Sequence, residues 1–270
     1  MRIVRTEVLR ATRTPDGPGT QLLRALGDTI EVQAWGPGAD WLCERAPILV
    51  GGADDHAAFP DVHAGVSEWH LRFPGLRTPC TQSVWESLLP TILGQKVTGT
   101  EAHASFAALL GRLSEPAPGP FAEIRLRLPL DPSLVADTPS HVFHACGVER
   151  KRSDTIRRAA SYWRRLEELA ELPLAVGSQQ LAALPGIGAW SVSEVSQTAL
   201  GDSDAVSVGD YHLKNWASWA LAGEPRGTDE RMLELLEPFR PFRGRVLRLI
   251  GAVGLKAPRF GPRLSIQPRW

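Results

Sequence analysis

Apolar and polar residues alternate along two short stretches near the N-terminus, residues 2–9 and 29–35. This period of two is typical of strands that bury one face. A run rich in proline and glycine, residues 14–19, lies between them and favours a turn. Together with a short helix near Cys43, these stretches predict a small α+β domain over residues 1–74.

From residue 81 onward the apolar residues recur every three or four positions, as they do on one face of a helix. Glycine and proline divide this part of the chain into separate helices. The pattern predicts helices within residues 81–93, 101–113, 140–146, 152–169, 178–184, 190–200 and 232–236, with two more that start near 210 and 241. The sequence therefore predicts a mainly α fold, with a helical domain over residues 75–270.

A turn with two glycines joins two of these helices. Residues 184–190 read Leu-Pro-Gly-Ile-Gly-Ala-Trp, so that Gly186 and Gly188 flank Ile187. The backbone can turn tightly there and leave amide groups uncovered by side chains. The next helix begins with its positive end at this turn, which favours a bound anion such as a phosphate. The spacing predicts a helix-hairpin-helix over about residues 178–200, a motif that grips a nucleic-acid backbone, although a purely structural turn explains the glycines equally well.

Asp210 stands at the start of a helix that follows the hairpin. Aspartate is common at the first position of a helix, where its side chain accepts a backbone hydrogen bond, and that role alone accounts for the residue. A helix N-terminus also favours the charged form of a carboxylate. Asp210 is therefore a candidate for chemistry that needs an anion. Asp202 and Asp204 are rival carboxylates, but their loop is typical of turn formation.

The composition is typical of a soluble globular protein. The chain has 270 residues, of which 43% are hydrophobic and 22% are charged. No apolar run is long enough for a membrane span, and the N-terminus has no apolar signal core. The odd number of widely spaced cysteines predicts reduced thiols, hence a cytoplasmic protein, and excludes a four-cysteine iron–sulfur cluster. No histidine spacing predicts a metal site.

Positive and negative charges are unevenly distributed. The totals balance, with 30 basic and 30 acidic residues. Acidic residues dominate between residues 28 and 68, whereas basic residues dominate between 239 and 270 and cluster within 150–165. This asymmetry predicts one face for phosphates and another turned away from them. Arginines that only solvate exposed helices would produce the same clusters.

The hairpin and the residues around it resemble the helix-hairpin-helix DNA glycosylase superfamily, and within it the bacterial 3-methyladenine DNA glycosylase II family. The resemblance is carried by residues 184–190, by their spacing to Asp210-Tyr211, and by an upstream run, residues 85–97. It covers roughly residues 75–255. It implies a helical glycosylase core in which Asp210 is the catalytic carboxylate and a damaged base is flipped into a pocket beside it.

The same resemblance assigns further roles. Trp190 stands where superfamily members that also cut the strand have a lysine nucleophile, and tryptophan cannot form an imine. Trp190 and Tyr211 are implied to line the base pocket, with ordinary core packing as the alternative for each. The implied DNA-binding residues are Gln95, Lys96, Gly186, Ile187, Gly188 and Lys214. Lys96 takes the place of an apolar wedge, so it either fills the gap left by the flipped base or is simply an exposed lysine at a turn.

Two residues depart from the best-known member of that family. Glu194, one helical turn after Trp190, replaces a tyrosine, and Gly251 replaces a tryptophan of the pocket. We therefore expect a wider or more polar pocket that includes Glu194.

These observations predict a monofunctional DNA glycosylase that excises alkylated purines of the 3-methyladenine kind and leaves an abasic site. Its partner would be double-stranded DNA with damaged bases, and the protein would act as a monomer away from membranes. No cofactor is expected, although a monovalent cation at the hairpin stays open. The alternatives are a non-catalytic protein that binds damaged DNA and a glycosylase for oxidised or deaminated bases.

Overall fold

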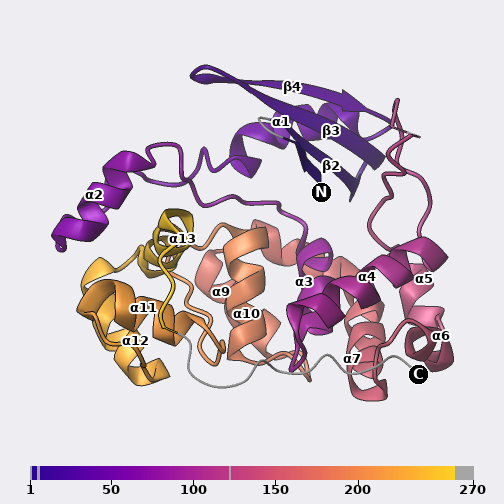
Figure 1. The fold of residues 1–270 in the computed structure, drawn as a ribbon. Helices are drawn as coiled ribbons and strands as arrows, with labels where there is room; N and C mark the ends of the chain where they lie inside the picture. The colour runs from indigo at the N-terminus through magenta and orange to yellow at the C-terminus, as the bar shows by residue number, and fades with distance from the viewer. Residues whose placement is uncertain (1, 5–6, 122, 259–270) are drawn as a thin grey trace. The chain divides into compact units, whose positions relative to one another are not determined.

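The structure, a computed structural model, describes residues 2–4, 7–121 and 123–258 (Figure 1). The described residues form two compact units, one from residues 2–49 and 92–163 and the other from residues 50–91 and 164–258. Both units are discontinuous along the chain, whereas the predicted domains are consecutive. The predicted boundary between residues 74 and 75 therefore stays a prediction. The mainly α fold with a small antiparallel sheet is confirmed.

The first unit begins with a four-stranded antiparallel sheet in the order β1-β2-β3-β4. Its strands are β1 (Arg2–Val4), β2 (Glu7–Thr14), β3 (Gly17–Leu26) and β4 (Thr29–Trp35). The alternating pattern predicted β4 and the region of β1 and β2. It did not predict β3, because Pro18 and Gly19 were interpreted as part of a longer turn.

Helix α1 (Ala39–Leu49) packs against β3 and β4 (Figure 1). A Cβ atom at Gly19 would lie 2.6 Å from Leu42 Cδ1, so a side chain there would have to displace the buried Leu42 side chain. The glycine within β3 thus accommodates the close packing of α1 on the sheet.

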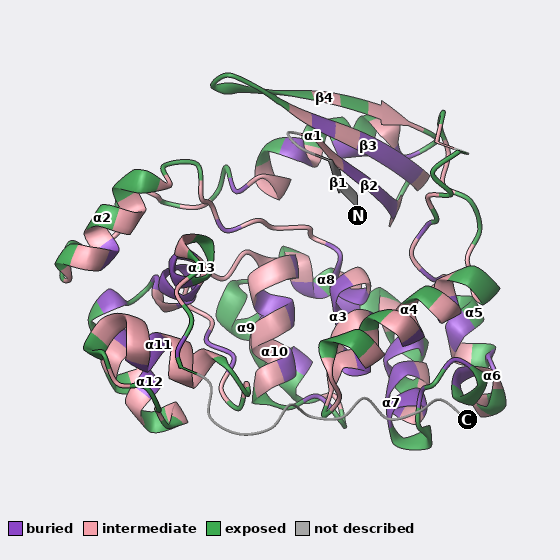
Figure 2. Cartoon of the chain, in the orientation of Figure 1, coloured by how far each residue is buried: buried purple, intermediate pink, exposed green. Residues whose placement is uncertain are grey.

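The other helices of the first unit are α4 (Gly99–Leu113), α5 (Pro132–Asp137), α6 (Ser140–Ala145) and α7 (Arg150–Ser161). They differ in length, from six residues in α5 and α6 to fifteen in α4. Helix α4 starts with a capping box, in which the Thr98 hydroxyl accepts from the backbone N–H of Glu101 and the Glu101 carboxylate accepts from that of Thr98. Helix α7 buries Ile156, Ala159 and Ala160, as the purple part of its ribbon shows (Figure 2).

The predicted helix over residues 152–169 is interrupted. After α7, Tyr162 leaves the helical conformation, and a second helix, α8 (Trp163–Glu168), follows with the 3-10 turn η1 (Leu169–Glu171). Helix α3 (Val84–Gly94) carries the chain from the second unit into the first, and α8 lies where it returns.

The second unit is helical throughout. It contains α2 (Ala64–Arg72), α9 (Leu174–Ala182), α10 (Ala189–Val195), the π-helical turn η2 (Ser196–Leu200), α11 (Leu213–Ala222), α12 (Asp229–Leu236), the 3-10 turn η3 (Glu237–Phe239) and α13 (Arg243–Val253). Its core is apolar, with Val66, Met232, Leu236, Leu249 and Ile250 completely buried. None of the described helices is both long enough and apolar enough to cross a bilayer.

A charged pair lies within this core. Arg245, on α13, is only 1% exposed, and its Nη1 lies 3.2 Å from Oδ2 of Asp54, whose side chain is 3% exposed. Asp54 Oδ2 also accepts a hydrogen bond from the backbone N–H of Thr78 at 2.7 Å, and Arg245 Nη2 donates to the carbonyl of Leu76. Burial lowers the pKa of Arg245, and the charge of Asp54 opposes that effect. This pair ties α13 to the chain segments around residues 54 and 76–78.

Replacing Asp54 by alanine is expected to lower the free energy of unfolding by about 3–5 kcal/mol, because Arg245 would then keep a buried charge with no carboxylate beside it. Urea denaturation at neutral pH measures the effect. Glu224→Gln, which weakens a half-exposed pair with Arg231, is the control and should lower the denaturation midpoint far less than Asp54→Ala does. Equal midpoints for Asp54→Ala and the wild type would contradict the prediction.

Candidate nucleic-acid interface and carboxylate site

Two helices flank the turn of the predicted helix-hairpin-helix. Helix α9 ends at Ala182, and α10 begins at Ala189. Gly186 has φ +95°, a value that side chains disfavour, so glycine is required there by the backbone itself. The N–H of Ile187 donates to the carbonyl of Leu184 at 3.0 Å, and the Ile187 side chain is buried. Ile187 thus anchors the turn to the unit from within.

Gly188 is different, because neither strain nor packing requires it. It is the N-cap of α10 with φ −98° and ψ 179°, a conformation open to any residue. A Cβ atom built there meets nothing within 4 Å. What glycine provides at this exposed position is bare backbone at a helix start, where the first N–H groups have no partner inside the helix. The arrangement suits an anion that approaches the backbone closely.

Asp210 is held at the start of α11 by the backbone. Its Oδ1 accepts hydrogen bonds from the N–H groups of His212 at 2.7 Å and Leu213 at 3.0 Å. The helix begins later than predicted, since His212 is the N-cap residue and Asp210 precedes it by two positions. The other oxygen, Oδ2, accepts no hydrogen bond from the described residues. The half-buried carboxylate therefore has one oxygen fixed by the helix and one available.

Glu194, on α10, lies near Asp210 in the second unit. Burial raises the pKa of the Glu194 carboxyl, and the nearby charge of Asp210 raises it further. A hydrogen bond from the Ser207 hydroxyl to Glu194 Oε1, at 2.5 Å, and the charge of Arg248 act in the opposite direction. The structure thus brings together two carboxyl groups that the sequence separates by 16 positions.

Arg248, on α13, is a member of this cluster that the sequence did not single out. Burial lowers the pKa of its guanidinium, while Glu194 and Asp54 oppose the shift. Its Nη2 makes one long hydrogen bond, 3.5 Å, to the carbonyl of Gln197. The sequence feature that could have identified Arg248 is its position among Val246, Leu247 and other apolar residues of the last helix.

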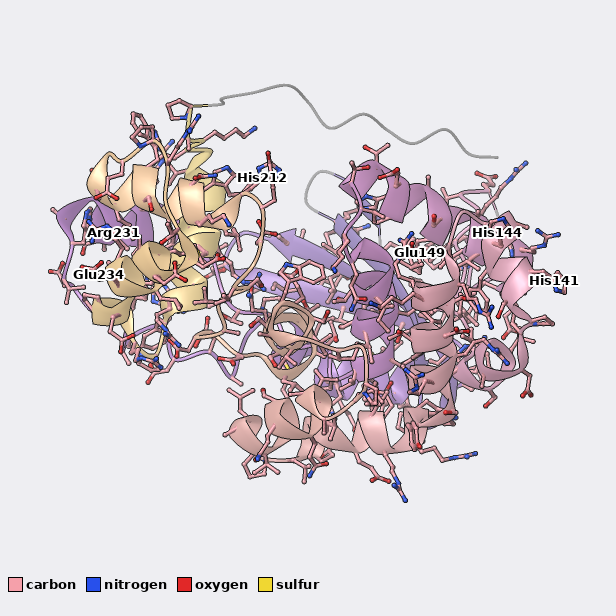
Figure 3. The ribbon with its side chains drawn as sticks, turned by 90° about the horizontal axis from the view of Figure 1, so that it is seen from below. His141, His144, Glu149, His212, Arg231 and Glu234 are labelled. Atoms are coloured by element: carbon pink, nitrogen blue, oxygen red, sulfur yellow. The ribbon has the colours of Figure 1, made fainter. Side chains whose placement is uncertain are left out.

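The two aromatic residues predicted to line the base pocket, Trp190 and Tyr211, differ in burial. Trp190 is half-buried on α10, one turn before Glu194. Tyr211 is 66% exposed, and its ring meets that of His212 edge to face. His212 in turn stacks on Trp216 of α11, with ring centroids 5.7 Å apart. Figure 3 marks His212 at the start of this helix. The rings of Tyr211 and His212, next to Asp210 in the sequence, are therefore exposed to solvent, whereas Trp216 packs against the core of the unit.

Lys214 is already engaged within the unit. Its Nζ lies 3.6 Å from Oδ2 of Asp229, at the start of α12, and Asp229 Oδ1 also accepts from the backbone N–H of Gly209. Arg231 and Glu234, farther along α12 (Figure 3), form another ion pair at 2.9 Å. The predicted contact of Lys214 with DNA stays a prediction, and it would require this pair with Asp229 to be shared or broken.

Gln95 and Lys96 belong to the first unit, unlike the other predicted site residues. The N–H of Gln95 donates to the carbonyl of Ile92 at 3.2 Å, so Gln95 still closes the end of α3. Lys96 follows with φ +56°, a left-handed conformation that is uncommon for lysine, and it is exposed. Arg152 Nη1 donates to the Leu93 carbonyl at 2.7 Å and fixes this helix end. The hydrogen bond from Arg152 therefore fixes the end of α3, and the backbone strain lies at Lys96.

Three other predictions concern residues near these sites. Gly251, on α13, is exposed, and a Cβ atom there meets nothing within 4 Å. Asp202 Oδ1 accepts from the N–H groups of Asp204 and Ala205, and Asp204 binds the Arg243 guanidinium through both oxygens. Both aspartates thus have structural partners, as their turn-like sequence indicated. Within residues 7–121 and 123–258, no three or more His, Cys, Asp or Glu side chains are grouped to hold a metal ion.

Known structures share this architecture. A 3-methyladenine DNA glycosylase from Archaeoglobus fulgidus superposes with a TM-score of 0.74 and 17% identity, over 92% of this chain and 87% of that one. An 8-oxoguanine glycosylase/lyase from Clostridium acetobutylicum, in complex with double-stranded DNA, superposes with a TM-score of 0.65 and 12% identity, over 89% of this chain and 86% of that one.

Sequence comparison gives a weaker similarity. No family model matches the chain. A probable bifunctional transcriptional activator/DNA repair enzyme AlkA of Mycobacterium tuberculosis is 26% identical over 165 residues, which cover 58% of this chain. The match spans only 30% of that relative's length. The chain therefore has the fold of the helix-hairpin-helix DNA glycosylases, and the resemblance to 3-methyladenine DNA glycosylases that its sequence indicated is confirmed.

Proposed function

We propose that the protein is a monofunctional DNA glycosylase that removes alkylated purines of the 3-methyladenine kind from duplex DNA and leaves an abasic site. The observation that supports this most directly is the half-buried Asp210 carboxylate. Two backbone N–H groups fix one oxygen, and the other accepts no hydrogen bond from the described residues. The likeness to 3-methyladenine DNA glycosylases adds the class of substrate.

Breaking a glycosidic bond produces a sugar with oxocarbenium character, so positive charge develops at the anomeric carbon. A carboxylate held rigidly nearby stabilises that charge without having to reorganise. Asp210 meets this requirement, because its position is set by the start of α11. Its free oxygen can face the sugar or accept a proton from the attacking water. An alkylated purine already carries positive charge and leaves without protonation.

The hairpin would hold the DNA backbone. Gly188 leaves the start of α10 uncovered, and phosphate oxygens are the anions that duplex DNA presents there. The strained, exposed Lys96 turn would contact DNA from the first unit. The protein would act as a monomer on duplex DNA with damaged bases. Trp190, Tyr211 and His212 supply rings on which a flipped base can stack.

A glycosylase for oxidised or deaminated bases is the second candidate. The half-buried Glu194 favours it, because a carboxyl group can exchange hydrogen bonds with polar groups on such bases. The similarity in fold to an 8-oxoguanine glycosylase/lyase is compatible with either substrate class.

Asp210→Asn is expected to reduce the release of methylated purines at least about a hundred-fold, because the amide keeps the two hydrogen bonds but loses the charge. Chromatography of bases released from methylated duplex DNA measures this loss. Asp202→Asn is a matched control, since Asp202 caps two backbone N–H groups in the same way. Equal release by Asp210→Asn and the wild type would contradict the assignment. Tight binding of the wild type without release of any base would indicate a protein that only binds damage.

The wild type should leave the DNA strand intact until alkali is added, because the indole of Trp190 cannot form an imine with the abasic sugar. Gel analysis of the product before and after alkali tests this, and borohydride should trap no covalent complex. A trapped complex would mean that another amine acts as nucleophile. The loss of this complex in a Lys214→Gln variant would identify Lys214 as that nucleophile.

Gly188→Ala is expected to weaken binding to DNA about ten-fold, as the loss of roughly one charge-assisted hydrogen bond to phosphate would do. The fold should be unaffected, because a Cβ atom there meets nothing. Fluorescence anisotropy at fixed salt measures the affinity. Gly111→Ala, at an equally open glycine of α4, is the control. Unchanged affinity of Gly188→Ala would show that the hairpin is only a structural turn.

A further inference from the structure

The two oxygens of the Glu194 carboxyl have different surroundings. Oε1 accepts a hydrogen bond from the Ser207 hydroxyl at 2.5 Å. The oxygen of that hydroxyl is itself 3.4 Å from Gln197 Nε2, which also donates to the carbonyl of Ala205 at 3.0 Å. The Gln197 amide group donates to the Ala205 carbonyl and to the Ser207 hydroxyl oxygen. Because the Ser207 hydroxyl accepts from Gln197, its own proton is directed at Glu194.

This hydrogen-bond chain determines where Glu194 can carry a proton. Oε1 is an acceptor, so a proton on the carboxyl sits on Oε2. Oε2 accepts no hydrogen bond from the described residues, and it is not among their fully buried side-chain atoms that lack partners. An accessible, protonated oxygen in a half-buried carboxyl is a hydrogen-bond donor with no acceptor of its own.

Two charged residues of the second unit act on Glu194. Asp210, before α11, is a like charge, whereas Arg248 of α13 is an opposite one. Arg248 is shared, because Asp54 also attracts it. Ser207 supplies the hydrogen bond. Burial is the largest influence, so the pKa of the Glu194 carboxyl is raised despite Arg248 and Ser207.

We propose that Glu194 is the general acid for uncharged purine lesions, which extends the activity beyond bases that are already cationic. The inference rests on the proposed glycosylase function and on the Asp210 site. Under this proposal Asp210 and Glu194 have separate tasks. One supplies a carboxylate toward the sugar, and the other supplies a proton toward the base.

The reaction balances with water as the only other reactant. As the C1′–N bond breaks, its electron pair goes to the base, and the Oε2 proton of Glu194 goes to a ring nitrogen of the purine. Asp210 stabilises the cationic sugar. The oxygen of a water molecule then bonds to C1′, and the proton that water loses restores the Glu194 acid. The products are the free neutral base and an abasic sugar with a hydroxyl at C1′.

The test compares two duplexes in single-turnover assays across pH, one with cationic 7-methylguanine and one with neutral hypoxanthine. Glu194→Gln keeps the size of the side chain and an acceptor for Ser207 but cannot deliver a proton. We expect this variant to lower the ratio of hypoxanthine to 7-methylguanine release at least about ten-fold. Glu234→Gln, the same change at the exposed end of the α12 ion pair (Figure 3), should leave the ratio unchanged.

The pH profile separates proton delivery from simple packing. In the wild type, hypoxanthine release should be fastest where Glu194 is protonated and should fall as pH rises through the pKa of Glu194. The ratio for Glu194→Gln should not change with pH. Ser207→Ala removes a hydrogen bond that favours the charged form, so it should raise the pKa and move the fall to higher pH by about one unit.

Each outcome decides between the two proposals. Release of 7-methylguanine with no release of hypoxanthine by the wild type, or an unchanged ratio in Glu194→Gln, overturns the role of Glu194 and leaves the glycosylase function standing. Release of neither base by the wild type overturns both. A lower ratio with an unchanged pH profile also overturns the role, because Glu194 would then act only through packing.

Discussion

The buried ion pair of Arg245 and Asp54 is the constraint on which the second unit depends. A guanidinium that is 1% exposed cannot be solvated, so α13 must stay where Asp54 and the Leu76 carbonyl can reach it. The start of the same helix lies close to the loop before Asp210. A Cβ atom at Gly244 would lie 2.5 Å from the Ala205 carbonyl oxygen, and Asp204 binds Arg243 at 2.8 Å. The helix and the loop are therefore positioned together.

The candidate site follows from that arrangement. The loop that Asp204 fixes to α13 goes on to Ser207 and Asp210, while α13 itself carries Arg248 toward Glu194. The hairpin adds the last part, because α10 starts at its turn and presents Glu194 after Trp190. A shift of α13 would thus change the charges around both carboxyls. These contacts explain how Glu194 and Asp210, 16 positions apart in the sequence, are held near each other.

Local features of the site were predictable, and tertiary ones were not. The hairpin could be predicted because Gly186 needs its backbone conformation whatever surrounds it, and the approximate start of the Asp210 helix followed from capping chemistry. Strand β3 was missed because the reason for Gly19 is the packing of α1, which lies outside the local sequence. The pairing of Lys214 with Asp229 and the interaction of Arg248 with Glu194 join separate helices, so spacing along the chain could not indicate them.

The choice of an acid at position 194 is itself informative. A glutamine would accept the same hydrogen bond from Ser207 and would avoid both the burial of an ionisable group and the repulsion from Asp210. The carboxyl therefore carries a cost of burial that its closest isostere lacks, and the attraction to Arg248 offsets part of that cost. A half-buried ionisable group with a raised pKa, beside a carboxylate with a free oxygen, is typical of residues retained for chemistry. Gly188 also indicates a residue retained for function, because the fold has room for a side chain at this position and glycine has none.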